Sequence, residues 1–380
     1  MGEAVLSVPG IEVVPVDNLR RRKQFIRLPW SIYRGDSRWV PPLLRDCSSM
    51  LTTSENPLLA SGPYSLFLAF QDGVPVGRVC AGINTKMNEA KGTREGYFCL
   101  FECVNQYAVA RALFNAALEF VAARGASLVK GPVSPTNGDE YRGVLVEGFQ
   151  HVPFLFQSYN PSYYPSFFER YGFAKELDYL GYWNRLSNAR QRGKAVEYAM
   201  RRYGFRVDPL DMRNMDRDIR DIKQVFDESM PQDWPDLIPP TLEELQAMGT
   251  RLKGLAESEL IRIARRGLRP IGVSVALPDY NQVLAHMNGR LFPLGWLKFL
   301  IFRRRIDALR IFILFIVPEF HKKGVSHALY HHTLEAATRL GYTWGDGSTV
   351  ADTNLTMRRD IERVGGIHYK TYRVYSKALH

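Results

Sequence analysis

The feature that most constrains this 380-residue chain is an order of local patterns that occurs twice. In the first half, residues 64–71 and 75–83 form an apolar strand pair around an Asp-Gly turn. A helical pattern over residues 106–124 follows, and residues 127–133 return as a strand. Strands and helices that alternate in this way predict an α/β (α+β) fold.

The second half repeats the same order of patterns. A strand pair is expected on either side of the turn at residues 265–267, and residues 309–317 form an apolar, β-branched run that predicts a buried strand. A helix is expected over residues 326–340, and a strand over residues 342–350. The repetition predicts two copies of one fold.

Two domains are therefore expected, at residues 1–190 and 191–380, each a twisted mixed β-sheet flanked by helices. A chain of this length buries roughly three quarters of the surface that it exposes when unfolded, so each copy can have a core. The Arg-rich residues 187–215 are expected to connect the two copies.

The charge of the chain indicates its class of partner. The formal net charge of +11 predicts an acidic partner, which is a nucleic acid, an anionic membrane surface or a polyanionic cofactor. The four cysteines lack the paired spacing of a zinc site, so no metal is expected, and their use fits a reducing cytoplasm. No signal peptide or spanning helix is expected either.

The most informative segment runs from the end of the apolar strand into the helix at residues 326–340. The loop His321-Lys322-Lys323-Gly324 separates the two elements. Free N–H groups and the positive end of a helix dipole suit a phosphate, and the lysines add charge. The alternative is an ordinary basic turn. The loop is neither a Walker loop nor the three-glycine dinucleotide fingerprint.

This order of strand, loop, helix, strand, Asn, helix and Tyr-containing strand resembles the GCN5-related N-acetyltransferase (GNAT) superfamily. The loop departs from the superfamily motif at His321, where Arg or Gln is usual, and at Ser326, where Gly or Ala is usual. The resemblance implies an acyl-CoA as substrate. The residues that it places on coenzyme A are Phe315, Ile316, Val317, Lys322, Lys323, Gly324, Val325, Ser326 and Asn354.

The first half is similar to a second, degenerate copy. Its corresponding loop, residues 102–110, has no glycine and no lysine. We therefore expect that this copy does not hold the cofactor, and that its residues 134–142 wall the substrate cleft.

The resemblance also implies a mechanism. The amine attacks the thioester directly, backbone N–H groups near residues 315–317 stabilise the oxyanion, and a carboxylate takes the proton. Asp346 is the candidate base, with Ser348 on the same face of its strand, and Glu319 is the rival base. Tyr372 or Tyr369 is the candidate donor to the thiolate. Structural alternatives are a turn cap for Asp346 and a helix N-cap for Asn354.

Residues 291–305 combine an apolar, aromatic run with three consecutive arginines. Trp, Phe and Leu beside a basic cluster are typical of a segment that lies in the headgroups of an anionic membrane surface. The alternative is a core helix packed on the sheet. The interfacial interpretation would favour a lipidic amine or a long acyl chain.

The whole chain also resembles a group of long, two-copy bacterial GNAT-like proteins, to which bacterial ceramide synthases belong. That resemblance implies acyl transfer to a sphingoid base, in the cytoplasm or at the inner face of the membrane. The alternatives are a small-molecule N-acetyltransferase and a non-catalytic acyl-CoA sensor. No nucleic-acid-binding pattern is recognised. The resemblance rests on residues 39–42, 131–132, 159–161, 288–293 and 372–375.

Overall fold

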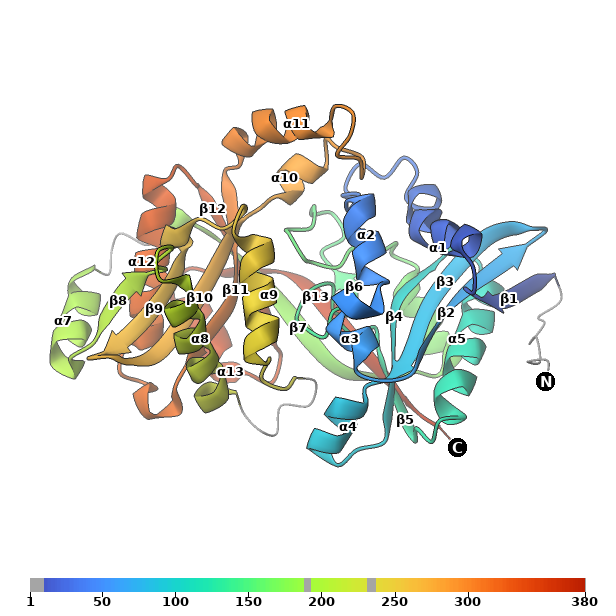
Figure 1. Cartoon of the computed structure of the whole chain (residues 1–380), viewed down its shortest axis with the longest axis horizontal. Coiled ribbons are helices and arrows are strands. Elements are labelled where there is room, and N and C mark those ends of the chain that lie inside the picture. The colour runs from blue at the N-terminus through green and yellow to red at the C-terminus, as the bar shows by residue number, and fades with distance from the viewer. Residues whose placement is uncertain (1–9, 188–192, 231–236, 380) are drawn as a thin grey trace. The chain divides into compact units, whose positions relative to one another are not determined.

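The computed structural model describes residues 10–187, 193–230 and 237–379 (Figure 1). The chain splits into two compact units. Unit 1 comprises Met1–Tyr179, Leu284–Leu300 and Lys370–His380, and unit 2 comprises Leu180–Val283 and Ile301–Tyr369. Each unit contains a mixed sheet flanked by helices, as the α/β pattern of the sequence predicts.

The sheet of unit 1 has the strand order β1-β2-β3-β4-β5-β13, and β6 pairs with β13. Strands β4 and β5 are parallel, whereas β1 to β4 are joined by antiparallel pairs. The elements are β1 (Ile11–Pro15), α1 (Leu19–Ile32), α2 (Leu44–Met50), α3 (Pro57–Ala60), β2 (Tyr64–Gln71), β3 (Val74–Ile83), α4 (Thr85–Lys91), β4 (Glu95–Cys103), α5 (Tyr107–Ala122), β5 (Leu128–Gly131), β6 (Val144–Glu147) and α6 (Tyr164–Tyr171). The strands β7 (Ala174–Arg185) and β13 (Ile367–Ala378) each begin in one unit and end in the other.

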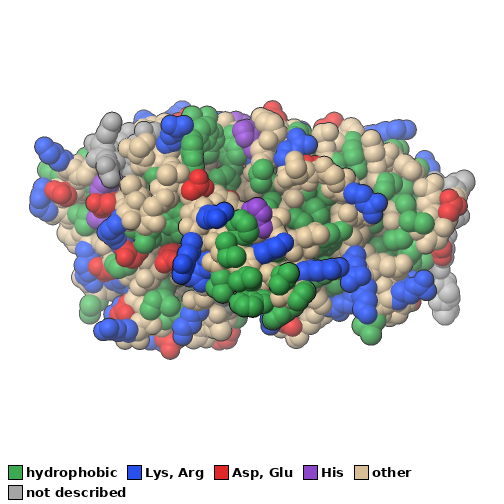
Figure 2. Space-filling view, turned by 90° about the horizontal axis from the view of Figure 1, so that it is seen from above, with side chains coloured by type: hydrophobic (Ala, Val, Ile, Leu, Met, Phe, Trp, Pro, Cys, Tyr) green, Lys and Arg blue, Asp and Glu red, His purple; other side chains and the backbone are tan. Residues whose placement is uncertain are grey.

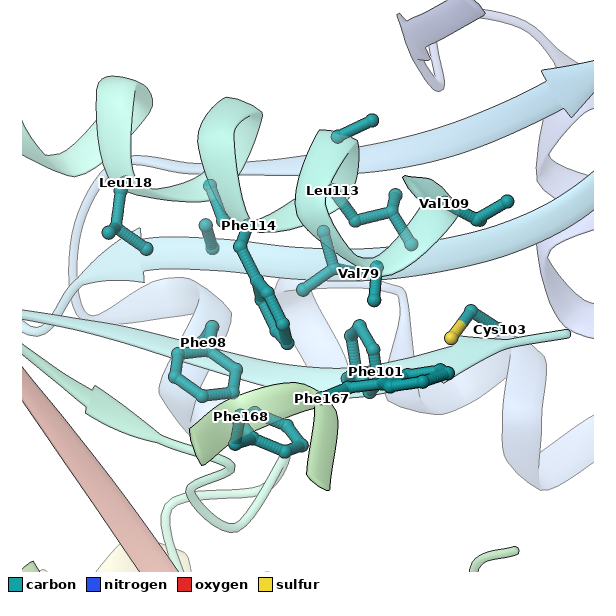
Figure 3. Packing of buried hydrophobic residues seen from close by; sticks show 14 of the residues in the cluster. Val79, Phe98, Phe101, Cys103, Val109, Leu113, Phe114, Leu118, Phe167 and Phe168 are labelled. Carbon is teal, nitrogen blue, oxygen red and sulfur yellow. The ribbon is translucent and has the colours of Figure 1, made fainter. Parts of the chain in front are cut away.

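Both faces of the sheet in unit 1 are covered, because successive strand residues point to opposite faces. On one face, α5 and α6 enclose an aromatic core in which Phe114 lies 4.9 Å from Phe101 and 4.9 Å from Phe168, measured between ring centroids (Figure 3). On the other face, α1 and α3 cover a second cluster that includes Leu68 and Cys80. Two layers of helix therefore exclude water from the sheet.

The sheet of unit 2 has the strand order β12-β11-β10-β9-β8. Helices α7 and α12 cover one face, and α8 and α9 cover the other. The elements are α7 (Gly193–Tyr203), β8 (Arg206–Pro209), α8 (Met215–Ser229), α9 (Leu242–Leu252), β9 (Ile261–Arg266), β10 (Arg269–Pro278), α10 (Asn281–Leu284), α11 (Gly295–Phe302), β11 (Ala308–Ile316), α12 (Val325–Arg339), β12 (Trp344–Ala351) and α13 (Leu355–Arg363).

The Arg-rich residues 187–215 are more than a connector. Their described part contains α7 and β8, and β8 pairs antiparallel with β9. Val196 and Phe205 from this region are buried against α12. Arg201 and Arg202 of α7 are exposed, whereas Val196, Met200 and Tyr203 pack inward, so the charge pattern of this segment marks the outer face of a helix.

Each unit contains one parallel strand pair that is joined over only three positions. In unit 1, β4 pairs with β5 through residues 95–97 and 128–130. In unit 2, β11 pairs with β12 through residues 308–310 and 344–346. All four strands continue beyond this pairing or lead at once into a loop. The two copies thus share a parallel pair that opens toward the following helix.

The strands β4 and β11 each contain an extra residue, or bulge, just beyond the point where their parallel pairing ends. On β11, Phe312 is inserted between the partners of Val275 and Ala276. On β4, the extra residue falls beside Leu100, whose φ of 53° is left-handed. A bulge bends its strand and breaks the ladder locally, so both copies use the same device to separate the two strands.

Candidate active site

The opening between β11 and β12 in unit 2 is the candidate site, because the predicted residues lie on the strands and loops around it. Pairing between the two strands ends at Arg310 and Asp346, although β11 runs on to Ile316 and β12 to Ala351. Beyond the last pair, alternate backbone groups of β11 point to the side of β12, where the ladder between these two strands no longer continues. Such a strand edge offers backbone donors and acceptors to an extended ligand.

The loop from β11 to α12 has the backbone geometry of an anion site. Gly324 is the N-cap of α12, with a φ of 81°, and no side chain caps the helix. The first N–H groups of a helix have no partner within the helix, and the helix dipole is positive at this end. A Cβ on Gly324 would lie 2.8 Å from the Cβ of Ala199, so the position requires glycine for space as well as for φ.

The side chains of this loop add positive charge beside the start of the helix. Lys322 is exposed and has a φ of 60°, and the Nζ atom of Lys323 lies 4.9 Å from the ring centroid of Phe320. Nε2 of His321 lies 3.0 Å from the carbonyl oxygen of Ile316. Val325 is buried and Ser326 is half-buried in the first turn of α12. The loop therefore joins uncapped backbone donors to two lysines.

The end of β11 is hydrogen-bonded to β10, on the edge opposite β12. The N–H group of Val317 donates to the carbonyl oxygen of Ile271 at 3.0 Å. Adjacent residues of a strand direct their backbone groups to opposite edges, so those of Ile316 face away from β10. Phe315 packs on Phe226, with 5.0 Å between ring centroids. The three predicted residues at this strand end thus have different environments.

A buried charge cluster lies where the strand pairing ends. Asp346 is completely buried, and its Oδ1 atom lies 3.3 Å from Nε of Arg310, which is itself buried. The hydroxyl group of Tyr369 donates to Oδ2 of Asp346 at 2.8 Å. The carboxylate is therefore oriented by a cation on one oxygen and a phenol on the other. The sequence reasoning missed Arg310, although an arginine inside an apolar strand is a signal that a buried anion must accompany it.

Glu319, the rival base, has a different environment. Its side chain is 53% exposed and its Oε2 atom accepts a hydrogen bond from NH1 of Arg269 at 2.9 Å. Arg269 also binds Glu228, at 2.9 Å. Glu319 is thus a surface carboxylate held by a shared arginine, whereas Asp346 is enclosed.

The remaining predicted residues occupy separate places. Asn354 is the N-cap of α13, where its Oδ1 atom accepts a hydrogen bond from the N–H group of Met357 at 3.1 Å. Ser348 lies in β12, and its side chain falls outside the described part of the structure. Tyr372 belongs to unit 1 and is buried there.

The equivalent loop of unit 1 has the opposite electrostatic character. Glu102, at the end of β4, is largely enclosed, with 13% of its side chain exposed, and accepts hydrogen bonds from the hydroxyl groups of Tyr33 at 2.8 Å and Tyr164 at 2.7 Å. Burial raises the pKa of the Glu102 carboxyl, and Arg78 partly offsets this. An enclosed acid at this position does not favour a phosphate.

Two further findings concern metals and membrane spans. Among the described residues, no group of three or more His, Cys, Asp or Glu side chains is placed to hold a metal ion. In the same part of the chain, every helix is too short or too polar to cross a membrane.

Solved structures with this architecture are GCN5-related N-acetyltransferases. A glucosamine N-acetyltransferase region of a fungal GH3 β-N-acetylglucosaminidase aligns with 99% of this chain and 39% of its own, at a TM-score of 0.60 and 14% identity. A tandem GNAT protein from the clavulanic acid biosynthesis pathway aligns with 97% of this chain and 98% of its own, at a TM-score of 0.58 and 12% identity. The chain therefore has the tandem GNAT fold.

Sequence comparison narrows this class. A protein of Caulobacter vibrioides named bacterial ceramide synthase is 30% identical over 97% of this chain and 98% of its own length. The Escherichia coli protein YghO is 28% identical over 94% of this chain and 93% of its own. No protein-family model matches the sequence. The chain belongs to the family of the Caulobacter bacterial ceramide synthase, and it is an N-acyltransferase.

Proposed function

We propose that the protein transfers an acyl group from an acyl-CoA thioester to the amino group of a long-chain lipidic amine of the sphingoid-base type. The observation that carries the proposal is the uncapped, lysine-flanked start of α12 directly beyond the opening between β11 and β12. The name of the Caulobacter relative supports a sphingoid base as the amine. We place the protein in the cytoplasm, at the inner face of an anionic membrane.

Coenzyme A is assigned to the loop and strand of unit 2. The N–H groups of Gly324, Val325 and Ser326, with the charges of Lys322 and Lys323, would bind its diphosphate. Asn354 would contact the pantetheine arm from the start of α13.

The thioester carbonyl is assigned to the opening itself. Because the N–H group of Val317 is bonded to Ile271, the donor to this carbonyl would be that of Ile316. The aromatic residue before it, Phe315, would pack beside the acyl group. A preorganised N–H donor stabilises the negative oxygen more than the neutral carbonyl, which is the form of catalysis that this edge can supply.

The proposed reaction needs no protein nucleophile. The amine nitrogen forms a bond to the thioester carbon, and the C–S bond then breaks to release the thiolate of coenzyme A. Asp346 would take the proton from nitrogen, with its carboxylate oriented by Arg310 and Tyr369. The thiolate would receive a proton from Tyr372, with Tyr369 as the alternative donor. Glu319 remains the rival base, and Ser348 a polar neighbour on β12.

The test is release of free thiol from palmitoyl-CoA and acetyl-CoA with a panel of amines that includes sphinganine. We expect turnover of palmitoyl-CoA with sphinganine, and a loss of about 100-fold or more in Asp346→Asn because general base catalysis contributes about that much. Glu319→Gln tests the rival base: we expect it to retain turnover because this carboxylate is exposed, and a loss as large as that of Asp346→Asn would assign the base to Glu319.

Other outcomes would replace the proposal. Turnover of acetyl-CoA with a small amine alone would show a small-molecule N-acetyltransferase. Binding of acyl-CoA without thiol release for any amine would show a sensor. If neither thioester raises the melting temperature, the assignment of coenzyme A is wrong.

A further inference from the structure

The segment of residues 290–305 places an unusual amount of apolar surface in water. The described residues include fifteen exposed large hydrophobic side chains, and six of these lie in this segment between residues 292 and 301. Their exposed fractions range from 43% to 72%. We call this group the apolar cap. It consists of Phe292, Leu294, Trp296, Leu297, Leu300 and Ile301.

Helix α11 carries most of the apolar cap on one side, and its opposite side, with Gly295, Phe299 and Phe302, is buried or half-buried. Trp296 and Leu297 are both exposed, as are Leu300 and Ile301 one turn later, and only Gly295 is buried. Side chains at positions i, i+1, i+4 and i+5 form one broad side of a helix, so the exposed side of α11 is apolar. The alternative of a core helix packed on the sheet is therefore wrong. An exposed apolar side of this size marks a site for an apolar partner outside the protein.

The base of the segment is fixed in unit 1. Nε1 of Trp30 donates a hydrogen bond to Oδ1 of Asn288 at 3.0 Å, and the N–H group of Leu44 donates to the carbonyl oxygen of Gly289 at 2.9 Å. Gly289 has a φ of 74°, and a Cβ there would lie 2.5 Å from Cζ2 of Trp30. The apolar cap is thus the end of an anchored projection.

Positive charge surrounds the apolar cap. The exposed cations of the segment are one lysine and four arginines, which we call the basic rim, and residues 280–306 contain no Asp or Glu. Figure 2 looks down on the side where α11 lies in Figure 1, and it shows hydrophobic side chains gathered there with Lys and Arg around them. The basic rim consists of Arg290, Lys298, Arg303, Arg304 and Arg305.

We propose that residues 290–305 dock the protein on a bilayer that contains anionic phospholipid. The apolar cap enters the boundary between headgroups and acyl chains, and the basic rim lies at the level of the phosphates. This inference rests on the proposed function, because a lipidic amine resides in the bilayer to which the segment would bind. A second copy of the chain fits the surface less well, since a two-fold contact would oppose one basic rim to another.

The first experiment is flotation of the full-length protein with phosphatidylcholine vesicles that do or do not contain phosphatidylglycerol. We expect binding that requires phosphatidylglycerol and falls at least about tenfold in Leu297→Glu/Leu300→Glu, because two carboxylates would enter the apolar layer. The matched control is Leu268→Glu/Leu340→Glu, which changes two exposed leucines elsewhere and should bind as the wild type does.

The second experiment separates charge from apolar contact. Arg303→Glu/Arg304→Glu/Arg305→Glu should abolish the preference for phosphatidylglycerol. Arg124→Glu/Arg213→Glu/Arg220→Glu makes the same change in net charge at three other exposed arginines and should retain that preference. Equal loss in both triple variants would show that only the overall charge matters, and would overturn the proposal.

Two outcomes separate this inference from the proposed function. If Leu297→Glu/Leu300→Glu binds vesicles normally while the wild type turns over its substrates, the docking surface is wrong and the activity stands. If vesicle binding follows the predictions but no amine is acylated, the docking surface stands and the proposed function fails. Dimerisation of the wild type without vesicles that this double variant abolishes would assign the surface to a second copy.

Discussion

At the scale of single residues, the two copies differ most at the end of the strand before the long helix. Unit 2 has lysines and an uncapped glycine there, whereas unit 1 has Glu102, whose side chain is only 13% exposed. Two tyrosine hydroxyls and Arg78, whose NH2 atom lies 3.9 Å from Oε1, surround this carboxyl. Unit 1 therefore has an enclosed acid where unit 2 has the proposed anion site.

The raised pKa of Glu102 predicts a pH-dependent stability. The folded protein holds this proton more tightly than the unfolded chain, so wild-type stability should fall as pH rises above the ordinary Glu pKa of 4.5 and until the folded pKa is passed. Glu102→Gln removes this loss, at about 1.4 kcal/mol for each unit of pKa difference. The stability of the variant relative to wild type should rise with pH across that window.

Chemical denaturation at several pH values measures this difference. Glu55→Gln, which removes an exposed glutamate of the same unit, is the control for net charge. A constant difference between Glu102→Gln and wild type across the window would contradict the assignment.

At the scale of elements, helix α8 is fixed to strand β9 by one buried arginine. NH2 of Arg265 lies 2.6 Å from Oδ1 of Asp218 and 2.7 Å from Oδ2 of Asp221, and its NH1 lies 3.1 Å from Oδ2 of Asp208. Asp218 is completely buried. Removing the arginine would leave the buried carboxylate of Asp218 paired with Arg217, whose side chain is 53% exposed and screened by water.

We therefore expect Arg265→Met to lower the free energy of unfolding by about 3–5 kcal/mol, which is typical when one partner of a buried ion pair is lost. Arg269→Met on the neighbouring strand is the control, because Arg269 is 44% exposed and its ion pairs are screened by water. Denaturant unfolding of both variants checks the prediction, and equal losses would count against it.

The order of elements could be predicted because it follows from local patterns. Asp72 and Gly73 form the turn between two strands, and Gly341 ends a helix. Both glycines have positive φ values, as such positions require. The bulge at Phe312 could not be predicted, since it depends on the register between β10 and β11. The helix α7 and the strand β8 could not be predicted either, because the many arginines of this segment indicated an exposed connector.

At the scale of the whole molecule, the two units differ in the loop before the long helix, and unit 2 has the lysines and the uncapped helix start there. We expect one acyl-CoA to bind per chain, and binding at about 100 times the dissociation constant to stabilise the fold by about 2.7 kcal/mol. Gly324→Ala should weaken this binding, because the added methyl group meets Ala199 and displaces the first N–H groups of α12.

Titration calorimetry with palmitoyl-CoA measures both the stoichiometry and the effect of the variant. Gly341→Ala at the other end of α12 is the matched control, since its φ of 95° is also left-handed but a Cβ there would have no atom within 4 Å. Two molecules bound per chain, or equal affinities in both variants, would refute the single-site assignment.

The sequence by itself determined the α/β class, the repetition and the position of the loop before α12, because all three depend on residues close together in the chain. A boundary between domains near residue 190 remains a prediction. Only the tertiary structure decided that Asp346 is enclosed by Arg310 and Tyr369, that Glu319 is exposed and that α11 projects into water. Burial and ion pairing join residues that are distant in the chain, so local patterns leave several arrangements open until packing selects one.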